Sequence, residues 1–290
     1  MTAAAAEPVI SVRDLRKTYK TKDGPVHAVD GLDLDVHHGE VFALLGPNGA
    51  GKTTTVEILE AYRKRNSGEV SVLGHDPAHP TAAWRQRIGI VLQTNNDLSE
   101  LTVEEVVRLF TTFYATPSDP LEVIDRVGLG EKRRTRSRGL SGGQRRRLDV
   151  ALGILGQPEL LFLDEPTTGF DPEARREFWG LIENLADTGT TIMLTTHYLD
   201  EAEHLADRVA VIARGRIVAL DTPAHLGGRD TADATVRWQD NGEMREVRTS
   251  TPTKVVSELA ARFDGEVPSL VVTRPSLEDT YLRLIGEQPS

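Results

Sequence analysis

The chain has 290 residues, of which 39% are hydrophobic and 27% charged, which is ordinary for a globular protein with a sizeable core. A formal net charge of -10 disfavours nucleic acid and anionic lipid as partners, and the absence of cysteine excludes disulfides, thiolate metal sites and thiol nucleophiles. No stretch approaches the ~18 consecutive apolar residues that a membrane-spanning helix needs, and residues 1–8 do not resemble a signal peptide. We therefore expect a soluble cytoplasmic protein, to which another chain supplies any membrane span.

Predicted strands and helices alternate along most of the chain. Val41–Leu45 and Leu160–Leu163 are continuous apolar runs, which favours strands buried on both faces of a parallel sheet. Further strands are predicted at 9–12, 32–36, 70–73, 88–92, 191–195, 209–212 and 217–220, and helices at 51–60, 102–128, 141–155 and 171–185. This alternation predicts an α/β core around a parallel sheet.

The composition becomes more polar after Gly227 and Gly228. The segment beyond them predicts a small α+β appendage, with strands near 234–238 and 269–273 and helices near 253–263 and 276–285. We therefore expect a main domain over residues 8–228 and a small C-terminal accessory domain over residues 229–290.

A glycine-rich loop lies between the apolar strand 41–45 and the helix that follows. It matches the pattern G-x-x-x-x-G-K-[ST] with Gly46, Pro47, Asn48, Gly49, Ala50, Gly51, Lys52 and Thr53. Glycines allow successive backbone N–H groups to surround phosphate oxygens, and the helix directs its positive end at the same anion. Because a buried strand precedes the loop and a helix follows it, a chance match is disfavoured. We expect Lys52 to contact the outer phosphates of a nucleotide, Thr53 to ligate Mg²⁺, and Thr54 to belong to the same site.

Two acidic residues end the second apolar strand. In a phosphate-loop protein this position supplies the aspartate that holds Mg²⁺ directly or through water, a role that we assign to Asp164. Pro166 interrupts the strand, so we expect Glu165 to turn toward the nucleotide and polarise the attacking water, as a general base or as a hydrogen-bond acceptor. The chain has 44 acidic residues, so this pair would carry little weight without the phosphate loop.

The segment Leu140-Ser141-Gly142-Gly143-Gln144 resembles the signature of the ATP-binding cassette (ABC) ATPases. Other residues match the family's pattern in order: Tyr19 resembles the aromatic residue that stacks on adenine, Gln93 the Q-loop glutamine, Asp171 the D-loop aspartate, and His197 the switch histidine. Phe170 stands where leucine is commoner. The resemblance covers residues 8–228. It implies a P-loop NTPase cassette with a parallel core sheet, an antiparallel β subdomain and a helical subdomain at about 94–155.

The resemblance also implies a mechanism. Two cassettes pair head-to-tail as a homodimer with two ATP molecules between them, and Ser141, Gly142, Gly143 and Gln144 of one chain face the phosphate loop of the other. Asp171 belongs to the same nucleotide site. Gln93 is expected to sense Mg²⁺ as a ligand and to act in catalysis with Lys52, Glu165 and His197. The segment 94–115 is where such families contact a membrane subunit.

Three classes of ABC protein compete: a transporter ATPase, a soluble ATPase that acts on ribosomes or DNA, and a non-catalytic regulatory cassette. A single set of motifs disfavours the ribosome-acting class, the short segment before the signature disfavours DNA repair, and intact Lys52 and Glu165 disfavour a regulatory cassette. A basic cluster at 132–138 and 145–147 has no interleaved aromatic residues, so we expect no nucleic-acid partner.

Within transporters, the closest resemblance is to bacterial drug-exporter ATPases of the daunorubicin-resistance type. The segments that carry it are 140–149, 164–172 and 275–282. The resemblance implies a peripheral protein on the cytoplasmic face of the membrane, which powers export through a separate polytopic permease of the ABC-2 type. Lipid or polysaccharide is the alternative cargo, and this step rests on family analogy.

Overall fold

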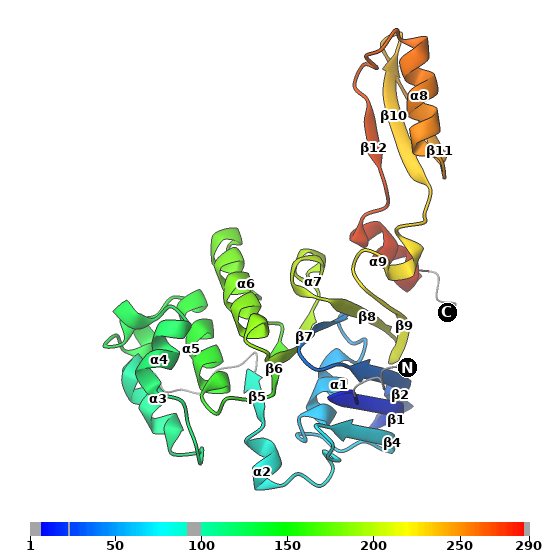
Figure 1. Ribbon diagram of the computed structural model, residues 1–290. Coiled ribbons are helices and arrows are strands. Elements are labelled where there is room, and N and C mark those ends of the chain that lie inside the picture. Colours follow the sequence, from blue (N-terminus) through cyan, green and yellow to red (C-terminus); the bar gives the residue numbers. More distant parts are fainter. Residues whose placement is uncertain (1–6, 23, 92–99, 287–290) are drawn as a thin grey trace, which may run out of the picture. The chain divides into compact units, whose positions relative to one another are not determined.

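The computed structural model describes residues 7–22, 24–91 and 100–286 (Figure 1). The chain forms two compact units, Met1–Val218 and Ala219–Ser290. No helix of the described residues is both long and apolar enough to cross a membrane.

A six-stranded sheet forms the centre of the first unit. Its strand order is β5-β6-β7-β3-β8-β9, and the first five strands of this order are parallel. The strands are β3 (Val41–Leu45), β5 (Ile88–Val91), β6 (Leu160–Asp164), β7 (Thr191–Thr196), β8 (Arg208–Ala213) and β9 (Arg216–Asp221). Every residue of β3 and the first four residues of β6 are buried, as the continuous apolar runs predict. The predicted α/β core with a parallel sheet is confirmed.

A second, antiparallel sheet lies in the same unit. Its order is β2-β1-β4, with β1 (Ile10–Thr21), β2 (Gly24–Val36) and β4 (Ser67–Val72). Helices α1 (Lys52–Leu59), α6 (Pro172–Asp187) and α7 (Leu199–Leu205) follow strands of the parallel sheet, and the short α2 (Ala82–Arg85) precedes β5. The sequence patterns did not predict α2 and α7.

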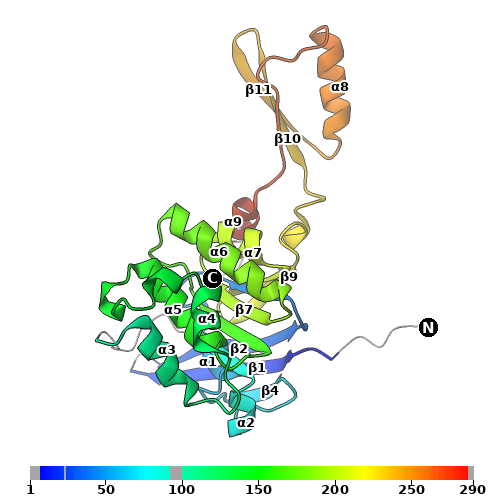
Figure 2. The same cartoon turned by 60° about the vertical axis from the view of Figure 1, so that its left-hand side comes forward.

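Three helices group together in the first unit: α3 (Val103–Thr111), α4 (Pro120–Arg126) and α5 (Gly142–Ile154) (Figure 2). Thr102 and Glu105 form a capping box at the start of α3. The prediction of one helix over 102–128 is wrong, because Asp119 caps a new helix whose first residue is Pro120. A proline at this position starts a helix and cannot continue one.

The second unit has a three-stranded sheet in the order β11-β10-β12, with β10 (Ala234–Asp240), β11 (Glu243–Thr249) and β12 (Val271–Thr273). Helix α8 (Pro252–Arg262) packs on it around Val236, Leu259 and Val267, and α9 (Leu277–Gly286) follows β12. Strand β11 was missed because its polar residues are almost all exposed. Asn241 and Gly242, both at positive φ in the two-residue turn before it, were the available signal.

Candidate active site

The predicted phosphate loop joins β3 to α1, and its glycines are required by geometry. Gly51 has a φ of 110°, and a Cβ atom there would lie 2.3 Å from the carbonyl oxygen of Ala28. A Cβ at Gly46 would lie 2.4 Å from the carbonyl oxygen of Ile212. Gly49 also has a positive φ of 79°. The loop can therefore keep this path only with glycine at positions 46 and 51, whereas a side chain at position 49 would add backbone strain alone.

Lys52 lies at the first position of α1 and points back across the loop. Its side chain is 5% exposed, and Nζ donates hydrogen bonds to the carbonyl oxygens of Gly46 at 2.8 Å and Pro47 at 3.4 Å. Burial lowers the pKa of Lys52, while the charges of Glu165 and Asp164 act in the opposite direction. The ammonium group is thus held at the mouth of the loop, close to two carboxylates.

Glu165 lies between two of the other predicted catalytic residues. Its Oε1 is 3.7 Å from Lys52 Nζ, and its Oε2 is 3.3 Å from Nδ1 of His197. The backbone of Glu165 has a φ of 43°, a value that residues other than glycine rarely adopt. Its N–H donates to the carbonyl oxygen of Thr195 at 3.1 Å. The structure therefore brings Lys52, Glu165 and His197 together, and it holds Glu165 in a strained conformation of the kind that gathers at functional sites.

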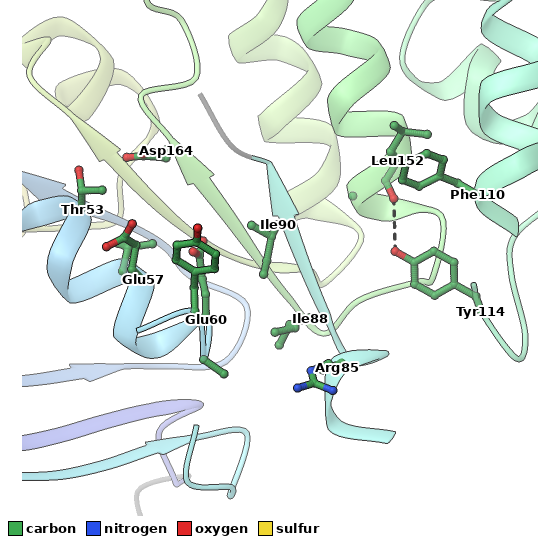
Figure 3. A pocket seen from close by; sticks show the side chains of 14 residues that line it. Thr53, Glu57, Glu60, Arg85, Ile88, Ile90, Phe110, Tyr114, Leu152 and Asp164 are labelled. Atoms are coloured by element: carbon green, nitrogen blue, oxygen red, sulfur yellow. Dashed lines mark hydrogen bonds between the residues drawn. The ribbon is translucent and has the colours of Figure 1, made fainter. Parts of the chain in front are cut away.

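Asp164 ends β6 opposite Thr195 of β7, whose hydroxyl donates a hydrogen bond to its Oδ1. Asp164 and Thr53 line one cavity of about 700 Å³ (Figure 3), so the structure places the two described candidates for Mg²⁺ ligation on the same cavity. Hydroxyl and carboxylate oxygens are the donors that Mg²⁺ prefers. Gln93, the third candidate ligand, lies outside the described residues.

Arg146 is a structural residue of this site that the sequence patterns did not identify. It is buried in α5, and its guanidinium donates to the carbonyl oxygens of Asp164 at 2.7 Å and Pro166 at 3.1 Å. It therefore supports the backbone on both sides of Glu165. The sequence placed Arg146 in a basic cluster, where nothing distinguished it from its neighbours. Other members of that cluster make ion pairs, such as Arg147 with Glu177 at 2.9 Å.

Tyr19 lies on β1, and its hydroxyl is 3.4 Å from Oγ1 of Thr54 in α1. The Lys17 ammonium and the Arg63 guanidinium lie 5.3 and 5.4 Å from the centre of its ring. The predicted adenine-stacking residue is therefore next to the helix that begins at the phosphate loop. Its ring is flanked by two cations.

The signature residues open helix α5. Ser141 caps the helix, its Oγ accepts from Gln144 N at 3.2 Å, and Gln144 Oε1 accepts from Ser141 N at 3.1 Å. A Cβ atom at Gly142 would meet nothing within 4 Å, so the first turn is accessible. Within the described chain, no hydrogen bond or ion pair joins Ser141, Gly142, Gly143 or Gln144 to the phosphate loop.

Asp171 caps α6, and its Oδ1 accepts from the backbone N–H groups of Glu173 at 3.0 Å and Ala174 at 2.8 Å. Phe170 packs edge-on against Phe178, with ring centres 5.6 Å apart. Phe170, Gly142 and Glu165 line a second cavity of about 540 Å³. The signature helix and the loop that follows β6 therefore face a common space in one chain.

Known proteins resemble this chain over nearly its whole length. It is 46% identical to the daunorubicin/doxorubicin resistance ATP-binding protein DrrA of Streptomyces peucetius, in an alignment that covers 89% of this chain and 88% of that one. A family model described as ABC transporter matches residues 29–168. The chain belongs to the ABC transporter family. The expectation that it is an ATP-binding, ATP-hydrolysing cassette is confirmed.

Other relatives of the cassette are also export proteins by name. A fluoroquinolones export ATP-binding protein of Mycobacterium tuberculosis is 35% identical over 99% of the cassette and 96% of its own length. The Nod factor export ATP-binding protein I of Ralstonia nicotianae is 35% identical, in an alignment that covers 97% of this chain and 95% of that one. By their names, these relatives are ATP-binding proteins of export systems.

Solved structures agree on the fold. A dimeric ATP-binding cassette in a post-hydrolysis state, bound to ADP and phosphate, superposes with a TM-score of 0.66 over 73% of this chain and 98% of that one, at 24% identity. The cbiO1 protein of Clostridium perfringens, part of an ABC transporter complex, superposes with a TM-score of 0.65. The superposition covers 76% of this chain and 90% of that one, at 28% identity. The predicted cassette fold is confirmed.

Proposed function

We propose that the cassette hydrolyses MgATP as a head-to-tail homodimer and thereby powers export of drugs or other hydrophobic small molecules through a separate ABC-2-type permease. The convergence of Lys52, Glu165 and His197 beside the phosphate loop carries this proposal, because it joins a phosphate-binding cation to a carboxylate that can polarise water. The cassette is peripheral, on the cytoplasmic face of the membrane.

We assign a role in binding and hydrolysis to each site residue. The loop from Gly46 to Gly51 surrounds the phosphates with N–H groups, and Thr54 and Tyr19 extend the site toward the base. Lys52 leaves the loop carbonyls to neutralise the outer phosphates. Thr53, Asp164 and Gln93 would hold Mg²⁺, which would add further neutralisation of the phosphate charge.

Glu165 orients and activates the attacking water, and His197 stabilises the transferring phosphoryl group beside it. Ser141, Gly142, Gly143 and Gln144 act in trans: the exposed first turn of α5 offers N–H groups to the γ-phosphate bound by the partner chain. Asp171 lies beside the same composite site. Residues 8–228 form the ATPase domain, and residues 229–290 are an accessory domain that stabilises or regulates the dimer.

The relatives support the drug cargo. The 46% identical relative is named for daunorubicin and doxorubicin, whereas the 35% identical relatives are named for fluoroquinolones and for Nod factor. Cargo therefore varies within this group. Export of a lipid or polysaccharide is the second candidate.

The experiment uses the full chain with Glu165→Gln. We expect ATP binding to remain, turnover to be almost abolished, and dimers to accumulate, because the amide cannot accept a proton from water. Glu173→Gln, which changes an exposed acid in the first turn of α6, is the matched control and keeps wild-type turnover. Near-normal hydrolysis by Glu165→Gln would exclude Glu165 as the water-polarising group.

The same variant tests the partner. When membranes are solubilised in mild detergent with ATP and Mg²⁺, the tagged Glu165→Gln chain should co-purify with a polytopic membrane protein. Co-expression of that protein with the wild-type cassette should then lower daunorubicin accumulation in cells, and the variant should not. Recovery of ribosomes or nuclease-sensitive material, without a membrane protein, would overturn the transport function.

A further inference from the structure

The imidazole of His197 packs against a second aromatic ring, that of Tyr198. The centres of the two rings are 4.1 Å apart, and their planes meet at 38°. Tyr198 is partly buried, whereas 37% of the His197 side chain is exposed. The Tyr198 ring therefore restricts the orientation of an imidazole that is otherwise open to solvent.

Arg175 of α6 packs on the same tyrosine. Its guanidinium carbon lies 4.5 Å from the centre of the Tyr198 ring, within the range of a cation–π contact. Its Nη1 also donates to Oδ2 of Asp200, in the first turn of α7, at 2.9 Å. The side chain of Arg175 is only 19% exposed, and its buried Nε has no hydrogen-bond partner among the described residues. The guanidinium is thus held by one carboxylate and by the face of the ring, and burial strengthens the contact with the ring.

The Tyr198 hydroxyl group takes no part in these contacts. Within the part of the chain that the structure describes, it makes no hydrogen bond, and the backbone N–H of Tyr198 donates to Oγ1 of Thr196 at 2.9 Å. The ring alone therefore contacts both the imidazole of His197 and the guanidinium of Arg175.

These contacts connect two segments that meet at the candidate hydrolysis site. Arg175 lies one turn after Asp171, the cap of α6, and its N–H donates to the carbonyl oxygen of Asp171 at 3.0 Å. This helix follows the loop that carries Glu165, whereas His197 and Tyr198 lie between β7 and α7. Displacement of the start of α6 would therefore reach His197 through Arg175 and Tyr198.

We propose that Arg175 and Tyr198 are positioning residues, which hold the His197 imidazole against the Glu165 carboxylate and couple the start of α6 to hydrolysis. Nδ1 of His197 is 3.3 Å from Oε2 of Glu165, and an exposed imidazole without the ring beside it is free to leave that position. Small displacements of a catalytic group lower kcat. This inference rests on the proposed role of His197 in hydrolysis.

The test measures kcat and KM for ATP hydrolysis by the full chain. Tyr198→Leu should lower kcat by roughly tenfold and leave KM for ATP within about twofold, because its contacts with His197 and Arg175 do not involve the phosphate loop. Tyr198→Phe, which keeps the ring, should retain most of kcat. Arg175→Gln should lower kcat by roughly threefold to tenfold, because the cation on the ring is lost. Arg176→Gln, at an exposed neighbour, is the matched control and should behave as wild type.

The double variant with Arg175→Gln and Tyr198→Leu shows whether the arginine acts through the ring. Its kcat should match that of Tyr198→Leu within about twofold, because the arginine has then already lost the surface on which it acts. If the two single losses multiply, the effects are independent and the proposal is wrong. Equal losses in Tyr198→Phe and Tyr198→Leu would also overturn it, since the ring would then not be what positions His197. ATP binding and the thermal midpoint verify folding, and if Tyr198→Leu does not fold, the comparison of Arg175→Gln with Arg176→Gln decides.

His197→Ala separates this proposal from the proposed function. If His197→Ala is slow while Tyr198→Leu and Arg175→Gln turn over as wild type does, only the positioning role is wrong. If His197→Ala hydrolyses ATP at the normal rate, the proposed role of His197 is wrong, and the positioning role is wrong with it.

Discussion

The hydroxyl group of Thr167 donates a 2.8 Å hydrogen bond to Oε1 of Glu201, and both residues are fully buried. Trp179 Nε1 lies 3.4 Å from the same oxygen. Thr167 follows Glu165 closely in the chain, and Glu201 belongs to α7, which begins just after His197. This contact therefore ties the segments that carry Glu165 and His197 to each other. We infer that Glu201 is a positioning residue for the hydrolysis site.

Thr167→Val tests this link, because it keeps the shape of the side chain and removes the hydroxyl donor. We expect kcat for ATP hydrolysis to fall by roughly 10- to 100-fold, since small displacements of a catalytic group have effects of that size. The dissociation constant for ATP should stay within about twofold, because the phosphate loop is untouched.

Thr167→Ser is the matched control, since it retains the hydroxyl group and should restore most of kcat. If kcat falls by the same amount in both variants, the packing of the Thr167 side chain, and not its hydrogen bond to Glu201, is what supports turnover. If Glu165→Gln is inactive while Thr167→Val turns over normally, only the positioning role of Glu201 is wrong.

Glu60 should make the stability of the chain depend on pH. Its pKa is raised from 4.5 to about 8 in the folded chain, so folding keeps the carboxyl group protonated over a range in which the unfolded chain ionises it. Stability is therefore lost as the pH rises from about 4.5 toward 8. Glu60→Gln should raise the urea midpoint relative to wild type above pH 8 and change it little near pH 4.5. An equal difference in midpoint at both pH values would contradict the raised pKa.

Lys52→Ala should lower the affinity for ATP by roughly tenfold or more, because a charge-assisted contact to the outer phosphates is lost. The hydrogen bonds of Lys52 to Gly46 and Pro47 hold the loop in the absence of nucleotide, so the variant should also loosen the loop. Lys64→Ala, at an exposed lysine after α1, is the control. Unchanged ATP binding by Lys52→Ala, measured by equilibrium titration, would be incompatible with the proposed phosphate loop.

Much of the core could be predicted from the sequence, because local patterns determine it. The continuous apolar runs located β3 and β6, and the glycine and lysine spacing located the phosphate loop between a strand and a helix. The second unit was harder, since the polar strand β11 is held by backbone pairing with β10 and not by burial.

Residues that act through tertiary contacts could not be predicted. Glu201 is one of 44 acidic residues in the sequence, and only the fold brings it to Thr167 and Trp179. In the sequence, nothing distinguishes Arg146 from the adjacent Arg145 and Arg147. In the fold, Arg146 is the one of these three whose hydrogen bonds within the described chain reach the carbonyl groups on both sides of Glu165. The sequence also does not show that Glu60 is buried in the wall of a cavity.

Gly51→Ala should disrupt the phosphate loop more than any other alanine substitution of a glycine at positive φ near it. The substitution meets two penalties: a φ of 110° and a Cβ atom 2.3 Å from the carbonyl oxygen of Ala28. The neighbouring backbone must move, so ATP affinity and thermal stability should both fall. Gly39→Ala separates the two penalties, because its φ is 77° and its Cβ would meet nothing within 4 Å. That control should lose only about 1 kcal/mol of stability and keep ATP affinity. Equal effects of the two substitutions would show that backbone strain, and not the contact with Ala28, makes glycine necessary at position 51.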